Sequence, residues 1–362
     1  MSATASISNS DKINYLNIGL MLLSLIVAFY VPFELFLFSY AVLGPAHYLT
    51  EISWLHERKY FSNGKRDYIF LGVAGTLLFL VLYVFKPYNF LSPSVSDQFS
   101  TALVYLAFCA SFAMVLFKES YKRFIAFLVI LLCIAITKNA SAVLFFSVFL
   151  PTLIHVYLFT GLFMLYGALK GRSKTGYISC LLFAICPFLI FWIAPDAFVI
   201  SNYAHKTYKY FEAVNIYSLN FWDPNTYKFP FSTKAEYDTM FAAIYNSKLG
   251  LSIMRFIAFA YTYHYLNWFS KTSVIKWHQV PKKRLIIIGA LWLISVGFYY
   301  YDYKLGFDVL FLLSFLHVFL EFPLNHVTFL GIFKELGSIS GLTKTPVPVK
   351  GNPKGNPKMK KK

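Results

Sequence analysis

Most of the histidines in this chain lie inside long apolar stretches, where an imidazole needs an explanation. An ionisable side chain in the middle of a membrane helix is costly, and its default interpretation is a functional site. Four histidines come from four different stretches, and at about 1.5 Å per helical residue they lie roughly 10–26 Å before the next basic residue. The sequence therefore predicts that they converge on one buried site: His47, His155, His264 and His317.

Two of these histidines are followed by a glutamate four residues later. His47 and Glu51 occur in HYLTEISWLH, and His317 and Glu321 occur in HVFLEFPLNH. Positions i and i+4 share one helix face, so each motif is expected to place an imidazole beside a carboxylate. Each motif ends in a further histidine, which a straight helix places on the opposite face. Because a proline such as Pro323 can bend a helix, these histidines are additional ligand candidates: His56 and His326.

Imidazole-rich sites suit first-row transition metals, and iron is favoured here over copper or zinc. The two glutamates are expected to orient the ligating imidazoles or to complete the ligand shell. Tyr261 lies one turn before His264 and Asn267 one turn after it, so both are candidate catalytic residues on the same helix face. The alternative interpretation is a set of hydrogen-bonded core histidines with structural His–Glu pairs. The sequence contains no P-loop and no GxGxxG motif, so no nucleotide cofactor is predicted.

The elements that position these residues are expected to be membrane helices. Hydrophobic residues make up 58% of the chain and charged residues 14%, whereas a soluble domain carries about 25% charged residues. About ten stretches approach the roughly 20 residues that a membrane-spanning helix needs. The fold class is therefore an all-α polytopic bundle with helices at 14–31, 32–55, 68–86, 100–117, 123–138, 141–169, 177–194, 251–270, 285–301 and 307–333.

The basic residues orient this bundle. The loops after the second, fourth, sixth and eighth stretches carry HERKYFSNGKR, KESYKR, KGRSK and KTSVIKWHQVPKKR. Since cytoplasmic loops are enriched in Lys and Arg, both termini are expected on the cytoplasmic side of the membrane, most plainly a bacterial inner membrane. The net charge of +17 therefore reflects membrane topology, and no nucleic-acid partner is predicted.

The chain divides into a bundle and a tail. Residues 1–333 form the bundle, in which 195–250 is either an extracytoplasmic lid or a solvated connector. Residues 334–362 are rich in Pro, Gly and Lys and predict a disordered cytoplasmic tail. The lysines of this tail are expected to attract anionic lipid headgroups.

One short segment resembles a known family. Gly44-Pro45-Ala46-His47-Tyr48-Leu49-Thr50-Glu51 is similar to the Pro-His-Gly-Ala-x-Asp segment of the bacterial Brp/Blh-like β-carotene dioxygenases. The histidine and the carboxylate four residues later match, whereas the Gly-Ala after the histidine does not. The family's later pair of histidines four apart has no counterpart, since Trp268 follows His264 at that spacing. The resemblance implies a polytopic enzyme with histidine-bound iron, with His47 as a ligand.

Together these patterns predict a metal-dependent membrane oxygenase that acts on a hydrophobic lipid or isoprenoid drawn from the bilayer. The first alternative is a transporter or channel that uses the same His and Glu residues for metal transit or proton relay. The second is a non-catalytic assembly subunit, in which the histidines are dispensable.

Overall fold

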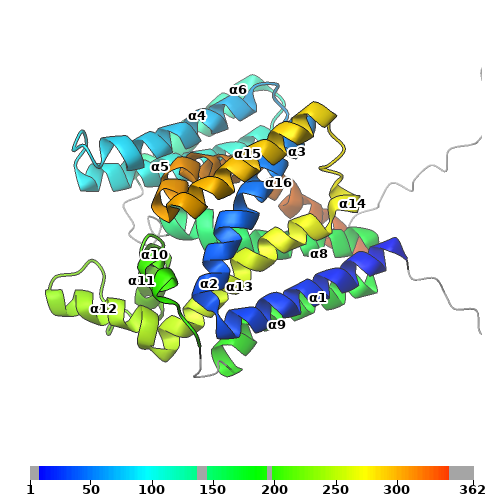
Figure 1. Ribbon diagram of the computed structural model, residues 1–362. Helices are drawn as coiled ribbons and strands as arrows, with labels where there is room; N and C mark the ends of the chain where they lie inside the picture. Colours follow the sequence, from blue (N-terminus) through cyan, green and yellow to red (C-terminus); the bar gives the residue numbers. More distant parts are fainter. Residues whose placement is uncertain (1–7, 137–144, 194–197, 342–362) are drawn as a thin grey trace, which may run out of the picture.

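Every element in the described part of the chain is helical (Figure 1). The computed structural model describes residues 8–136, 145–193 and 198–341. With η marking π- or 3₁₀-helical segments, the first range contains α1 (Asn9–Tyr30), α2 (Pro32–Phe38), η1 (Ser39–Leu43), α3 (Gly44–Glu57), η2 (Lys59–Phe61), α4 (Asp67–Leu80), η3 (Val81–Phe85), α5 (Pro93–Leu116) and α6 (Ser120–Ile136). The remaining ranges contain η4 (Phe145–Phe159), α8 (Thr160–Gly171), α9 (Lys174–Ile193), α10 (Asn202–Tyr208), α11 (Glu212–Trp222), α12 (Lys234–Asn246), α13 (Lys248–Ser270), α14 (Thr272–Ile275), α15 (Lys282–Tyr301) and α16 (Tyr303–Ile339).

Within the described residues, seven helical segments are long and apolar enough to cross a membrane. They are Asn9–Tyr30, Asp67–Phe85, Pro93–Leu116, Val148–Gly171, Lys174–Ile193, Lys282–Tyr301 and Tyr303–Ile339. The other three predicted ranges coincide with helical structure in α2 to α3, in α6 and in α13. The all-helical prediction is therefore confirmed, and the seven apolar helices indicate a membrane protein.

Side-chain caps fix where several helices begin. The hydroxyls of Ser8, Ser92 and Ser247 accept hydrogen bonds from backbone N–H groups in the first turns of α1, α5 and α13. The carboxylate of Asp302 does the same for α16. These short polar side chains satisfy N–H groups that have no partner inside the helix, so they set the register of the long helices that follow.

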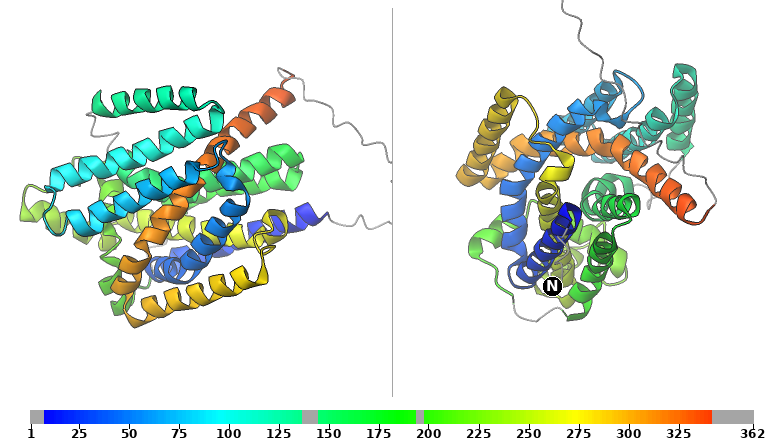
Figure 2. Two further views of the ribbon diagram at one scale, coloured as in Figure 1. Left: turned by 90° about the horizontal axis from the view of Figure 1, so that it is seen from above. Right: turned by 90° about the vertical axis from the view of Figure 1, so that its right-hand side faces the viewer.

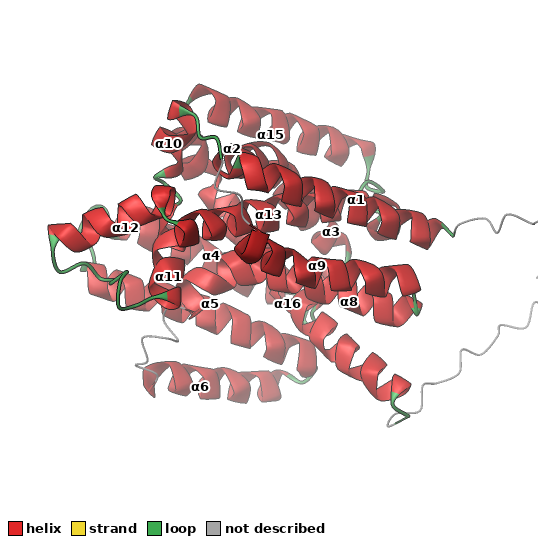
Figure 3. Ribbon diagram, turned by 90° about the horizontal axis from the view of Figure 1, so that it is seen from below, coloured by secondary structure: helices red, strands yellow, loops and turns green. Residues whose placement is uncertain are grey.

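Two helices form the interior of the bundle. α13 is buried on almost every side and packs against α1, α2, α9 and η4, while α16 packs against α3, α4, α5, α8 and α15. Figure 3 shows α1 and α9 covering α13. In contrast, α6 lies at the outer edge (Figure 2) and has no buried residue. A helix that is enclosed all round can carry functional side chains on any face.

Residues 202–246, within the predicted lid or connector, form three helices that pack on the bundle. α10 packs on α2, α11 on α13 and η4, and α12 on α11 and α13. The Tyr245 hydroxyl donates to Oε1 of Glu212 at 2.5 Å, and the Tyr208 hydroxyl donates to Oδ1 of Asn215 at 2.6 Å. The segment is therefore a covering layer that is attached to the bundle. Figure 1 places it on the left, away from α14 and the beginning of α1 on the right.

The last helix extends beyond residue 333, the predicted end of the bundle. α16 continues to Ile339, so residues 334–339 belong to the bundle helix and not to a disordered tail. Residues 342–362 lie outside the described residues, as do 137–144 between the predicted fifth and sixth stretches and 194–197 before the covering layer.

Candidate metal centre

Four helices bring the four predicted histidines together. His47 belongs to α3, His155 to η4, His264 to α13 and His317 to α16. Each is at most 7% exposed. The centroid of the His47 ring lies 4.6 Å from that of His264 and 5.4 Å from that of His317. The centroid of the His155 ring lies 5.0 Å from that of His264 and 5.1 Å from that of His317. The imidazoles therefore form one cluster in the interior, as the common depth of the four residues predicts.

Three of these residues could hold a metal ion directly. Ring nitrogens of His47, His155 and His317 all lie within 4.8 Å of one another. The fourth, His264, approaches the same group, since its Nε2 lies 3.0 Å from Nε2 of His47. Two nitrogens bound side by side to one metal at about 2.0–2.1 Å lie about 3 Å apart. This spacing therefore fits a shared metal ion.

A threonine on the neighbouring helix fixes the orientation of His264. The Thr160 hydroxyl donates to the carbonyl of Val156 at 2.9 Å and lies 2.7 Å from Nδ1 of His264. Because its one proton is used for Val156, this hydroxyl accepts a hydrogen bond from Nδ1–H of His264. The lone pair of His264 is then on Nε2, which faces His47, and such an outer partner is typical of a ligating histidine.

Two buried carboxylates complete the cluster. Glu51 Oε2 lies 3.0 Å from Nε2 of His47, as the i+4 spacing predicts. The prediction for the second motif was wrong: Glu321 Oε2 lies 3.2 Å from Nδ1 of His155, on a different helix. His317 turns instead onto Tyr48, with ring centroids 4.4 Å apart and planes at 23°. The carboxylate therefore links two helices where a local pair was expected.

The polar atoms of this cluster fit a cation. Neither glutamate–histidine contact has hydrogen-bond geometry, and both nitrogens of His155 lack hydrogen-bond partners, whereas the His317 ring has backbone partners at Leu313 and Ser314. Buried polar atoms are nearly always paired, and a carboxyl group in an apolar interior stays neutral unless a cation compensates its charge. In the described part of the chain, no Lys or Arg forms an ion pair with Glu51 or Glu321. A divalent metal would satisfy these atoms together.

Irregular helix geometry lies close to two of the ligands. The π-helical segment η1 leads directly into α3, which carries His47. His155 lies within the π-helical segment η4. Pro45 stands in the first turn of α3 and Pro151 inside η4. A π-helix widens the turn and rotates the residues that follow, and such segments frequently occur at functional sites. These segments therefore help to turn His47 and His155 towards α13.

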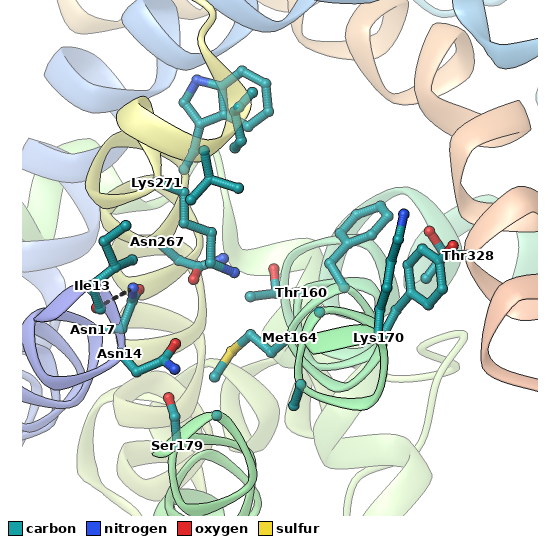
Figure 4. A pocket seen from close by; sticks show the side chains of 18 of the residues that line it. Ile13, Asn14, Asn17, Thr160, Met164, Lys170, Ser179, Asn267, Lys271 and Thr328 are labelled. Atoms are coloured by element: carbon teal, nitrogen blue, oxygen red, sulfur yellow. Dashed lines mark hydrogen bonds between the residues drawn. The ribbon is translucent and has the colours of Figure 1, made fainter. Parts of the chain in front are cut away.

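Two cavities meet at the cluster from opposite directions. The first, which we call the basic cavity, has a volume of about 750 Å³ and extends from the exposed Asn9 and Lys170 to His47, Glu51 and Glu321. Figure 4 shows side chains of α1, α8, α9, α13 and α16 around it. The second, which we call the aromatic cavity, has a volume of about 230 Å³ and contains His155 and His317 in its wall. His264 lines both cavities.

The covering layer contributes part of the wall of the aromatic cavity. Its wall contains aromatic side chains of the bundle and, from the end of α10 and the turn before α11, aromatic side chains of the covering layer. The first group includes Tyr40, Tyr48, Tyr261 and Tyr265, and the second includes Tyr208 and Phe211. All six are at most 9% exposed. The cluster therefore has one side lined mainly by aromatic side chains and one side that leads to exposed polar residues.

The remaining predicted site residues fall into two groups. Tyr261 lines the aromatic cavity and Asn267 lines the basic cavity, so both lie near the cluster as predicted. The two additional ligand candidates lie elsewhere. His56 is exposed and contacts the Tyr60 hydroxyl at 3.3 Å, and the Nε2 of His326 lies 2.9 Å from the carbonyl oxygen of Phe108. Nine residues of helix turn these two rings away from the centre.

No family of known proteins, curated protein or solved structure matches this chain.

Sequence reasoning missed the residues that surround the ligands. Thr160 orients His264, and the indole N–H of Trp268 donates to the Thr50 hydroxyl at 3.0 Å beside His47. Trp268 lies four residues after His264, so the i+4 rule could have placed it on the same face. Thr160 carries no such signal, because its contact depends on how the start of α8 lies against α13.

Proposed function

We propose that this protein is an integral membrane oxidoreductase that uses a histidine-bound metal, iron in the first place, on a hydrophobic substrate from the bilayer. The observation that carries the proposal is the convergence of four imidazoles and two carboxylates from different helices at one buried point. Such a set suits iron, copper or zinc. Iron would supply redox chemistry with dioxygen beside the substrate. Copper and zinc are the alternative metals, and elemental analysis distinguishes them from iron.

The residues of the chain would divide the work. His47, His155, His264 and His317 would hold the metal, and Thr160 would keep the Nε2 lone pair of His264 directed inwards. Glu51 and Glu321 line the basic cavity, so their carboxylates would exchange protons with water that enters from the surface.

The aromatic cavity would exclude bulk water from the opposite side. Tyr261 lies in its wall, and its hydroxyl would be available to a polar group of the reactants. Asn267 would serve in the same way on the side of the basic cavity.

The proposed topology follows the distribution of basic loops. With ten spans, both termini and the mouth of the basic cavity would lie on the cytoplasmic side of a bacterial inner membrane. The covering layer would lie on the opposite side. The lysines of the C-terminal tail would then meet anionic lipid headgroups. The similarity of Gly44–Glu51 to the β-carotene dioxygenase segment favours an isoprenoid among the hydrophobic substrates.

The test is the metal content of the purified protein. Elemental analysis should find one or two tightly held iron atoms per chain, lost in a His47→Ala, His264→Ala double variant. His326→Ala is the matched control, since this buried histidine binds the Phe108 carbonyl away from the cluster, and it should keep its iron. Absence of stoichiometric metal from all three samples would exclude the proposal.

A second function is favoured by the two cavities. A metal ion or proton in transit also needs a binding site that both sides of the membrane can reach in turn, and the cluster separates two chambers. Transport predicts weak, exchangeable metal binding and uptake of metal into proteoliposomes. An oxidoreductase predicts that the metal resists dialysis and that no uptake occurs.

A further inference from the structure

The basic cavity has the size and shape of a ligand site. Its volume of about 750 Å³ lies within the range of about 300–1,000 Å³ that small-molecule sites occupy. It begins between the first turn of α1 and the turn from α8 to α9, and it ends at His47, Glu51, His264 and Glu321. Apolar side chains such as Ile13, Phe163 and Met164 form much of the wall, with polar groups at both ends. Such a cavity suits a molecule with a polar end and an apolar body.

Two lysines stand at the outer end of this cavity. Lys271 follows α13 and is partly buried, and Lys170 lies near the end of α8 on the opposite wall (Figure 4). In the described part of the chain, neither forms an ion pair with a carboxylate, and Lys170 contacts the Tyr166 ring at 5.7 Å. The acidic residues that line the cavity, Glu51 and Glu321, lie at its inner end. A partly buried ammonium without a counterion favours the binding of an anion.

An unpaired amide lies between the lysine and the metal cluster. Asn267 is 7% exposed, and its Oδ1 has no hydrogen-bond partner. The neighbouring Asn17 is already paired, since its Oδ1 accepts from the Ser270 hydroxyl at 2.9 Å. Buried amides are normally satisfied, and an amide oxygen accepts hydrogen bonds, so Asn267 would accept from an O–H or N–H group of a bound molecule and would not bind the anion itself.

Two polar residues of α13 and the lysine that follows the helix therefore succeed one another from the mouth to the centre. Lys271, Asn267 and His264 are spaced by four and three residues and share one helix face. Seven residues of helix separate the planes of Lys271 and His264 by about 10 Å. A ligand whose charged end meets Lys271 would thus place atoms about 10 Å further along its chain next to the histidine cluster.

We infer that the substrate is an amphiphile with an anionic headgroup, a carboxylate or a phosphate, which binds at Lys271 and Lys170 with its apolar chain directed to the histidines. This inference rests on the proposed function for the role of the cluster, and it names the class of substrate. It also gives the site a means to position one part of an otherwise flexible chain, since the headgroup fixes the distance to the reacting atoms.

The experiment measures binding of three radiolabelled probes with the same sixteen-carbon chain to the purified full-length protein in a neutral detergent. Palmitate and hexadecyl phosphate carry the two headgroups, and hexadecanol is the uncharged control. At least one of the two anions should bind about tenfold more tightly than the alcohol. The reason is that the free energy of a hydrogen bond to a charged group corresponds to about a tenfold change in affinity. The anion that binds identifies the headgroup chemistry.

Two lysine variants locate the site. Lys271→Met keeps the apolar stem and should lower the affinity for the anion about tenfold, whereas Lys271→Arg should retain it. Lys174→Met, an exposed lysine in the first turn of α9 that does not line the cavity, is the matched control and should bind like the unmodified protein. Equal affinity for anion and alcohol, or no effect of Lys271→Met, would overturn the inference.

Metal analysis of the same preparations separates the two proposals. Iron without headgroup preference leaves the oxidoreductase proposal standing and overturns the substrate class. Headgroup-dependent binding without any metal supports the amphiphile site and overturns the metal-dependent function.

Discussion

At the scale of single residues, the hydroxyl of Thr160 is the most direct test of the centre, because it lies 2.7 Å from Nδ1 of the candidate ligand His264. In Thr160→Val the Nδ1–H of His264 loses its acceptor, so the ring is free to rotate or to change tautomer. We expect metal affinity to fall about 10- to 100-fold with the helical content unchanged. Competition with a metal chelator of known affinity measures this.

Thr262→Val provides the matched control. Thr262 is a buried threonine of α13, and its hydroxyl pairs with that of Ser39 at 2.8 Å instead of with a histidine. It should bind metal as tightly as the unmodified protein. If both variants bind equally well, Thr160 only packs between the helices and does not orient His264.

Lys271 should also make ligand binding depend on pH. Burial lowers the pKa of this ammonium group to about 8, against a small opposing effect of the Cys180 thiol on α9. Lys170 lies across the cavity, and Glu51 and Glu321 lie at its inner end. The lysine is charged below its pKa, so affinity for an anion should be highest near neutral pH and should fall as the pH rises through about 8.

Hexadecyl phosphate is the suitable probe for this measurement, because it stays anionic over the whole range. In Lys271→Arg the fall should disappear, since a guanidinium remains charged. A decline of the same size in the arginine variant would assign the effect to another group.

At the scale of elements, the covering layer depends on a polar contact between α11 and α12. Glu212 is 8% exposed and accepts a hydrogen bond from the Tyr245 hydroxyl at 2.5 Å. Burial raises the pKa of Glu212, and the hydrogen bond from Tyr245 opposes that rise. Tyr245→Phe leaves the carboxylate without this donor, which should cost about 1–3 kcal/mol of local stability.

Limited proteolysis in detergent should detect this loss as faster cleavage within residues 198–247. Tyr237→Phe is the control, since Tyr237 also belongs to α12 but is 45% exposed. Cleavage at equal rates in both variants would mean that apolar packing on α13 and η4 alone holds the layer.

The sequence predicts elements better than it predicts contacts between them. Hydropathy locates the helical stretches because a membrane-spanning helix needs about 20 mostly apolar residues. Counting residues from each histidine to the next basic residue places the four histidines at similar depths in the membrane. Neither signal contains the rotation of one helix against the next. For this reason Glu321 meets His155 and not His317, and His326 binds Phe108 on α5. The π-helical segments η1 and η4, which alter that rotation, have no sequence signature in the pattern of apolar residues.

At the scale of the whole molecule, the histidine cluster brings together side chains of four helices, and a metal ion bound there would join them. His47, His155, His264 and His317 come from α3, η4, α13 and α16, which include the two innermost helices. Without a metal, two carboxylates and several unpaired nitrogens are confined in the interior at a cost in free energy. Metal binding should therefore stabilise the entire bundle, by about 4 kcal/mol when the free metal is a thousandfold above its dissociation constant.

Removal of the metal should consequently lower the thermal stability of the whole protein. Incubation with a strong chelator is expected to reduce the unfolding temperature in detergent, and added metal should restore it. The His47→Ala, His264→Ala variant should unfold at one temperature with or without chelator, because it has no metal to lose. The His56→Ala variant, altered at an exposed histidine outside the cluster, should respond like the unmodified protein. If chelation leaves the unfolding temperature of the unmodified protein unchanged while removing bound metal, the ion does not hold the four helices together, and the bundle itself fixes the positions of the histidines.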